Sequence, residues 1–169
     1  MSDESKHHGL THLDRDGNPR MVDVGAKPNT DREAVAEGWV RASQAVLDAI
    51  QSGTVKKGNV SIVAQLAGIQ ATKRTSDMIP LCHPVPIDAV EVDVGVHDSR
   101  VHIVARVRSR WRTGIEMEAL TAVSAAALTV YDMCKAIDKG MRIEGIRLLE
   151  KRGGRSGTWK ADTGKTPQS

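Results

Sequence analysis

Aromatic side chains are almost absent from this chain of 169 residues, which has three Trp, one Tyr and no Phe. The core must therefore be built from Val, Ile, Leu, Met and Ala, and these compact side chains allow tight packing or an oligomer interface. Domains that bind RNA or single-stranded DNA usually expose aromatic rings on which bases stack. The scarcity of such rings argues against that class of protein.

Cysteine is also scarce, and Cys82 and Cys134 are the two that occur. No stretch has the composition of a signal peptide or of a membrane-spanning helix. We therefore expect a cytoplasmic protein whose thiols stay reduced. No further Cys or His stands at zinc-site spacing around Cys82 and His83, so the sequence predicts no metal.

The length suits one domain, and 40% hydrophobic residues are enough to form a core. We expect a single domain over residues 1–169, with an ordered core from about residue 10 to 157 between flexible tails. The net charge of +3 is a mild excess, which suits a polyphosphate substrate as well as it suits nucleic acid.

Two runs of alternating apolar residues, 90–96 and 101–107, flank the short polar turn Asp98-Ser99. Alternation with period two on both sides of a turn predicts a β-hairpin with one buried face. Further strands are expected at 142–150 and, more briefly, at 20–24. The segment after Arg152 is rich in Gly, Ser, Thr and Lys and is expected to fray.

Three helices are also predicted. Thr30 and Glu33 form a capping-box pattern, which predicts a helix from Thr30 to a C-cap at Gly53. Asn59 is expected to cap a second helix that continues to about Ile69. A long Ala-rich helix should cover 116–137 and end at Gly140. Helices and an antiparallel hairpin in one chain favour an α+β fold, with the helices on one face of the sheet.

Asp132 and Lys135 lie three residues apart on the long helix, so they share one face. Their apolar neighbours suggest partial burial, which would lower the pKa of Lys135 and let it transfer protons near neutrality. The alternative is a surface ion pair, worth about 0.2–0.5 kcal/mol.

Two carboxylates and a histidine are further candidates for contact with a ligand. His83 lies in the stiff segment Ile79–Pro84, where it could contact a phosphate or a base edge or could be purely structural. Glu116 and Glu118 begin the long helix, whose dipole favours anions there. Either carboxylate could alternatively hold the N–H donors of a guanine-like ring.

Basic residues stand beside glycines at 56–58 and 151–157. Glycine lets backbone N–H groups approach an anion, and Lys and Arg supply the charge. Neither stretch has the spacing of a P-loop. Solvated loop charge is the alternative interpretation.

Six longer motifs follow one another along the chain. They are M-V-D-V (Met21–Val24), K-G-N-V (Lys57–Val60), A-G-I-Q-A-T-K-R-T (Ala67–Thr75), I-P-L-C-H-P (Ile79–Pro84), G-I-E-M-E-A-L-T-A (Gly114–Ala122) and Y-D-M-C-K-A (Tyr131–Ala136). Together they resemble the cyclic pyranopterin monophosphate synthase (MoaC) family, and their order and spacing hold from about Leu10 to Gly157. Small departures are Asn59 and Arg155, where Asp and Lys occur in the family, and the additional Arg152.

This resemblance implies a ferredoxin-like fold, a homohexamer built as a trimer of dimers, and an active site near a subunit interface. It implies a lyase that needs no cofactor and turns 3′,8-cyclo-7,8-dihydroguanosine 5′-triphosphate into cyclic pyranopterin monophosphate and pyrophosphate. The implied catalytic residues are Asp132, Lys135, Lys57 and Lys151, and the implied substrate-binding residues are Leu81, Cys82, His83, Met117 and Glu118, to which we add Glu116 and Arg32.

Two alternatives belong to other classes of protein. A basic RNA-binding domain of the same fold predicts stacking aromatics on the strands, and residues 90–107 contain none. A non-catalytic oligomeric scaffold would leave Asp132 and Lys135 without a role on their apolar helix.

Overall fold

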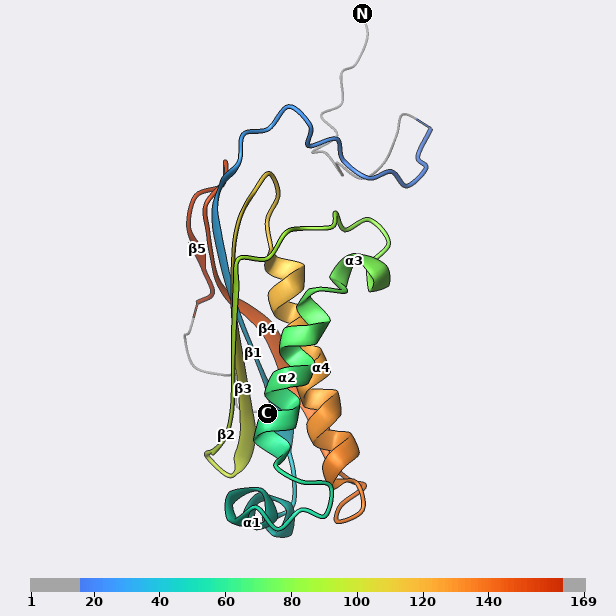
Figure 1. Ribbon diagram of the computed structural model, residues 1–169, viewed down its shortest axis with the longest axis vertical. Helices are drawn as coiled ribbons and strands as arrows, with labels where there is room; N and C mark the ends of the chain where they lie inside the picture. Colours follow the sequence, from blue (N-terminus) through green and yellow to red (C-terminus); the bar gives the residue numbers. More distant parts are fainter. Residues whose placement is uncertain (1–15, 163–169) are drawn as a thin grey trace, which may run out of the picture.

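The computed structural model describes residues 16–162, which form an antiparallel sheet with helices packed on one face (Figure 1). The predicted flexible N-terminus, residues 1–8, lies outside the described residues. In chain order the elements are β1 (Thr30–Arg41), α1 (Gln44–Ser52), α2 (Val60–Thr72), α3 (Thr75–Met78), β2 (Ala89–His97), β3 (Arg100–Trp111), α4 (Glu116–Cys134), β4 (Arg142–Arg152) and β5 (Trp159–Lys160).

The strands are ordered β2-β3-β1-β4-β5, and each neighbouring pair is antiparallel. The first four strands and the helices between them follow the β-α-β-β-α-β order of ferredoxin-like folds. Helices α2 and α4 lie side by side over the sheet (Figure 1). The predicted α+β class is therefore confirmed. None of the helices between residues 16 and 162 is long and apolar enough to cross a membrane.

The predicted hairpin is confirmed as β2 and β3. Its turn residues Asp98 and Ser99 have φ angles of 48° and 58°, as a tight two-residue turn requires. On β3, Val101 and Ile103 point into the core, and the intervening residues are more exposed. The strand predicted at 142–150 is also confirmed, as β4.

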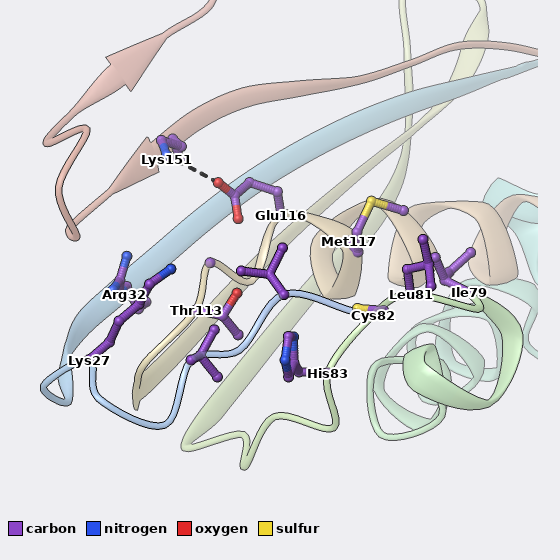
Figure 2. A pocket seen from close by; sticks show the side chains of 13 residues that line it. Lys27, Arg32, Ile79, Leu81, Cys82, His83, Thr113, Glu116, Met117 and Lys151 are labelled. Carbon is purple, nitrogen blue, oxygen red and sulfur yellow. Dashed lines mark ion pairs between the residues drawn. The ribbon is translucent and has the colours of Figure 1, made fainter. Parts of the chain in front are cut away.

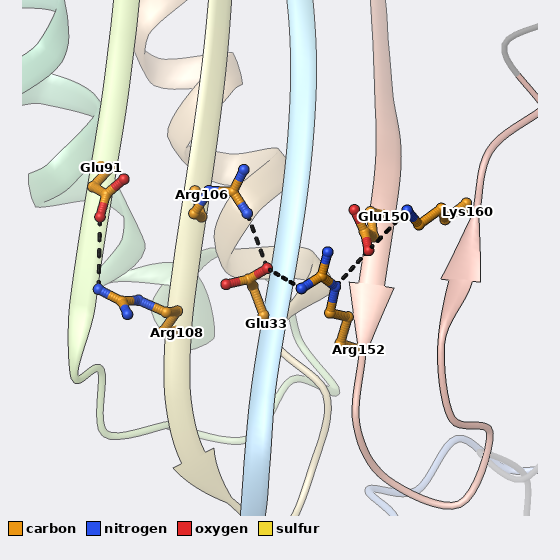
Figure 3. Close-up of polar contacts among 7 residues, drawn as sticks. All are labelled: Glu33, Glu91, Arg106, Arg108, Glu150, Arg152 and Lys160. Carbon is orange, nitrogen blue, oxygen red and sulfur yellow. Dashed lines mark hydrogen bonds and ion pairs between the residues drawn. The ribbon is translucent and has the colours of Figure 1, made fainter.

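The predicted helix from Thr30 is wrong in its first half, which is strand β1. Residues 34–38 are all buried, so this central strand lacks the alternation that identifies β structure. Its other face carries cross-strand ion pairs: Glu33 contacts Arg106 at 2.9 Å and Arg152 at 3.7 Å (Figure 3). The second half is helix α1, which ends at Gly53 (φ 68°) as predicted.

The predicted cap of α2 is confirmed. The side chain of Asn59 accepts a hydrogen bond from the backbone N–H of Ile62 at 3.1 Å, and so caps the helix. A Cβ atom at Gly68 would lie 3.0 Å from the carbonyl oxygen of Ala122, so glycine permits the close approach of α2 to α4.

Three boundaries differ from prediction. Residues 20–24 form no strand. Helix α4 ends at Cys134 with Lys135 as its C-cap, because residues 135–140 turn away and Gly140 donates its N–H to Asp138 instead. The segment after Arg152 contains strand β5, whose pairing with β4 the polar composition does not reveal.

Candidate active site

A cavity of about 620 Å³ lies at the end of α4 that adjoins α3 (Figure 2). Its walls come from five separate parts of the chain: residues 22–27, β1, the loop after α3, the corner before α4, and the end of β4. The lining residues are Val22, Val24, Lys27, Arg32, Ile79, Leu81, Cys82, His83, Thr113, Gly114, Glu116, Met117 and Lys151.

One side of the cavity is charged. Lys151 Nζ lies 3.3 Å from Glu116 Oε1, and Lys27 and Arg32 lie next to each other on the same side of the cavity (Figure 2). Gly114 allows this arrangement, because a Cβ there would overlap the Glu116 carboxylate. Three cations against one carboxylate favour an anionic ligand.

The other side is apolar and is built from Ile79, Leu81 and Met117, with Val22 and Val24 facing the cavity from the N-terminal segment. Proline residues on both sides of the Leu81–His83 stretch restrict its backbone. An apolar wall next to a cationic rim suits a flat ring that carries an anionic tail.

Glu118 does not line the cavity but lies buried behind Cys82. Its Oε1 atom is 3.8 Å from Cys82 Sγ, and its Oε2 atom has no hydrogen-bond partner among the described residues. Burial raises the pKa of Glu118. Burial, reinforced by the charge of Glu118, also raises the pKa of Cys82 to about 11. Cys82 is therefore a neutral thiol and a poor nucleophile near pH 7.

A second polar cluster lies at the other end of α4. Asp132 Oδ1 is 2.8 Å from Lys135 Nζ, and Asp132 Oδ2 is 2.7 Å from Lys57 Nζ. Lys57 also donates to the backbone carbonyl of Asp132 at 2.8 Å. The shared face predicted for Asp132 and Lys135 is confirmed. The third member, Lys57, comes from a distant part of the sequence, and no local pattern links it to Asp132.

The predicted partial burial of this cluster is wrong, because the side chains of Asp132 and Lys135 are 56% and 51% exposed. Hydrogen bonds from Lys135 and Lys57 lower the pKa of Asp132 to about 2. The hydrogen bond to Asp132 raises the pKa of Lys135, contrary to the predicted lowering. Near neutrality Asp132 is therefore an ionised acceptor and Lys135 a charged donor.

Residues 21–154 match the MoaC family. The chain belongs to the MoaC family. Three similar proteins are each named cyclic pyranopterin monophosphate synthase. The protein of Novosphingobium aromaticivorans is 57% identical over 152 residues, which cover 90% of this chain and 97% of that protein. Those of Thermomicrobium roseum and Rhodospirillum rubrum are 56% and 59% identical, and each alignment covers 90% of this chain and 93% of the relative.

Within this MoaC chain the predicted site residues fall into two groups. Asp132 follows Glu116 by sixteen positions along α4, a rise of about 24 Å. The cavity group comprises Arg32, Leu81, Cys82, His83, Glu116, Met117 and Lys151, with Glu118 behind it, and the far group comprises Lys57, Asp132 and Lys135.

Several cavity residues of the MoaC chain were not among the predicted site residues. Val22 and Val24 belong to one of the family motifs, but the local pattern predicted only a short strand there and no place in the site. Lys27 follows Gly25, the same pairing of a basic residue with a glycine that singled out Lys57 and Lys151, so this signal was present.

Neither group in the MoaC chain has the donors of a metal centre. Within residues 16–162 no group of three His, Cys, Asp or Glu side chains is placed to hold a metal ion. Cys82 and Cys134 are both free thiols.

Proposed function

We propose that this chain converts 3′,8-cyclo-7,8-dihydroguanosine 5′-triphosphate into cyclic pyranopterin monophosphate, with release of pyrophosphate. It is a MoaC enzyme, a lyase of molybdenum cofactor biosynthesis, and its 56–59% identity to three cyclic pyranopterin monophosphate synthases supports this activity. The observation that carries the substrate assignment is the cavity, where an apolar wall adjoins Lys27, Arg32 and Lys151. The wall would hold the ring system and the cations would hold the triphosphate.

The chemistry needs groups that move protons and groups that neutralise phosphate. Opening the purine-derived ring and forming the pterin are proton transfers. In this proposal Asp132 accepts protons and Lys135 donates them. Their ion pair places the two groups together but moves both pKa values away from neutrality, so contact with the substrate must shift them back. Lys57 and Lys151 stabilise the charge that develops as pyrophosphate leaves. No step requires a cofactor.

The two groups of residues must meet for this reaction, and one subunit holds them about 24 Å apart. We infer that a second subunit brings them together. Ile62, Leu66 and Leu128 are 52%, 61% and 62% exposed on the helices between the two groups. Exposed apolar side chains on two neighbouring helices are typical of a protein interface.

A two-fold axis across the helices would complete the site. It would place the Asp132 end of one α4 beside the Glu116 end of its partner's α4, because the two copies run in opposite directions. Each dimer would then have two composite sites that exclude water from the Asp132 cluster. Three such dimers would form the hexamer that the family resemblance implies. A cytoplasmic location suits the two free thiols.

RNA binding is less well supported. The sheet face opposite the helices carries paired charges such as Glu91 with Arg108 and Glu150 with Arg152 (Figure 3). This pairing reduces the positive charge that the face offers to phosphates, on which RNA affinity depends.

The direct test is incubation of the purified oligomer with the cyclised GTP derivative, followed by mass-spectrometric detection of the pterin and of pyrophosphate. We expect stoichiometric formation of both products by the wild type and none from unmodified GTP. A folded oligomer that binds the derivative but releases neither product would refute the proposal.

A further inference from the structure

Helix α1 begins without a cap from its own segment. Ser43 is the N-cap residue, and its side chain makes no capping hydrogen bond. Its backbone N–H instead donates to Asp138 Oδ2 at 3.0 Å, a contact between residues 95 positions apart. Asp138 Oδ1 also accepts the N–H of Gly140 at 2.7 Å. One carboxylate therefore joins the start of α1 to the connection between α4 and β4.

That connection is itself fixed to α4. The backbone N–H groups of Ile137 and Asp138 donate to the carbonyl of Cys134 at 2.8 and 3.2 Å. The hydroxyl of Tyr131 donates to the carbonyl of Lys139 at 3.0 Å. Because both anchors lie in the last turn of α4, Asp138 has a defined position relative to Asp132 in the same turn.

From α1 the chain returns to the same place through the loop that carries Lys57. The loop begins at Gly53, buries Val55, and closes with a hydrogen bond of 2.9 Å from the N–H of Gly58 to the carbonyl of Val55. Lys57 lies between these anchors and reaches Asp132 at 2.7 Å, although its own side chain is 48% exposed. The whole α1 segment lies at the end of α4 away from α3 (Figure 1).

We propose that Asp138 is a positioning residue that holds Lys57 against Asp132 by fixing the start of α1. The contacts form a ring. The end of α4 fixes Asp138, Asp138 accepts the N–H of Ser43 at the start of α1, and the loop after α1 carries Lys57, which pairs with Asp132 on α4. This assignment rests on the proposed function only where it concerns turnover. Two backbone donors, from Gly140 and Ser43, also lower the pKa of Asp138, so its carboxylate stays ionised near neutrality and accepts both bonds.

The kinetic test compares Asp138→Ala with Asp48→Ala, a matched control. Asp48 is an exposed carboxylate on α1, and its side chain contacts that of Gln44 in the same helix. We expect Asp138→Ala to lower kcat by about 10-fold, because a small displacement of a catalytic group is costly. Asp48→Ala should leave kcat unchanged.

A double-variant cycle tests whether Asp138 acts through Lys57. If it does, Asp138→Ala should cause no further loss in a Lys57→Ala background. An equal loss in both backgrounds would reduce Asp138 to a general stabiliser of α1 and overturn the proposal. Asp138→Asn retains one acceptor oxygen and provides the same comparison if the alanine variant unfolds.

A crystal structure of the Asp138 variant gives a result that needs no substrate. We expect the contact between Lys57 and Asp132 to lengthen while the contact between Lys135 and Asp132 stays at hydrogen-bond distance. An unmoved Lys57 would refute the positioning role. A displaced Lys57 together with full activity of Lys57→Ala would instead refute the catalytic role given to Lys57 above, so the two failures are distinguishable.

Discussion

Lys57 and Asp132 are 75 residues apart in the sequence, yet their side chains form an ion pair of 2.7 Å at the last turn of α4. Lys135 approaches the other oxygen of the same carboxylate at 2.8 Å. A carboxylate between two ammonium groups stays ionised over the whole physiological range, since its pKa falls to about 2. Asp132 is therefore an ionised hydrogen-bond acceptor near neutrality, with a charged donor at each of its oxygens.

Asp132→Asn should remove the acceptor with little change in volume. General acid–base groups contribute about 10²- to 10⁴-fold to the rate, so turnover should fall in that range. Lys135→Met should be comparably damaging, and the double variant should lose much less than the product of the single losses. Steady-state kinetics on variants of matched melting temperature and oligomer size would show this. Normal turnover by the folded Asp132→Asn variant would exclude Asp132 from the chemistry.

Lys151→Ala should reduce turnover by a factor of at least about 10 without changing the fold, because Lys151 supplies charge to the phosphate side of the cavity. Lys160→Ala is the matched control, since Lys160 pairs with Glu150 on the outer strands away from the cavity. Both rates would be measured at saturating substrate, beside circular dichroism spectra. Equal rates in the two variants would mean that Lys151 is a solvated surface charge with no role in turnover.

Glu118→Gln should change the pH dependence of stability. The folded pKa of Glu118 is raised by burial, so its contribution to stability is complete below its ordinary pKa and is lost as the pH rises through the folded pKa. The amide cannot ionise. The free energy of unfolding of the variant, relative to wild type, should therefore increase as the pH rises above the ordinary pKa of a glutamate. Urea titrations at several pH values would measure it, and a constant difference would mean that Glu118 ionises normally.

Gly38→Ala should destabilise the fold by about 1–3 kcal/mol, the usual range for overpacking. A Cβ at this position would lie 2.7 Å from Val123 Cγ1, between β1 and α4. Gly95→Ala is the control, because a Cβ there meets only the end of the His97 side chain, at 3.2 Å from Nε2. Thermal unfolding of both variants would make the comparison, and equal melting temperatures would contradict this account of the β1–α4 contact.

The sequence predicted most of the architecture, because the hairpin, α2, α4 and β4 carry periodicities and caps that act locally. Strand β1 was not predicted, because its middle residues, 34–38, are buried on both faces of the sheet. Its sequence therefore lacks the alternation of a strand and was interpreted as a helix. Strand β5 was not predicted, because two residues in a polar segment are too few to show the alternation of a strand. Its assignment depends on pairing with β4.

The sequence identified most residues of the candidate site but not which of them lie next to each other. Glu116 and Lys151, or Lys57 and Asp132, meet through long-range packing that no local spacing encodes. The predicted burial of Lys135 failed for a related reason: apolar neighbours on a helix do not determine which face the rest of the fold covers, and this face is exposed in a single chain. A second subunit would supply the missing cover.

The most direct test of the composite site mixes two inactive variants, Asp132→Asn and Lys151→Ala, by co-expression with different tags. If each site takes Asp132 from one subunit and Lys151 from its partner, every mixed dimer contains one site with both native residues. Random mixing should then restore about a quarter of the wild-type activity. If both residues act within one chain, no mixture can restore a native site. Activity of the purified mixed oligomer that stays at the level of the single variants would contradict the shared active site.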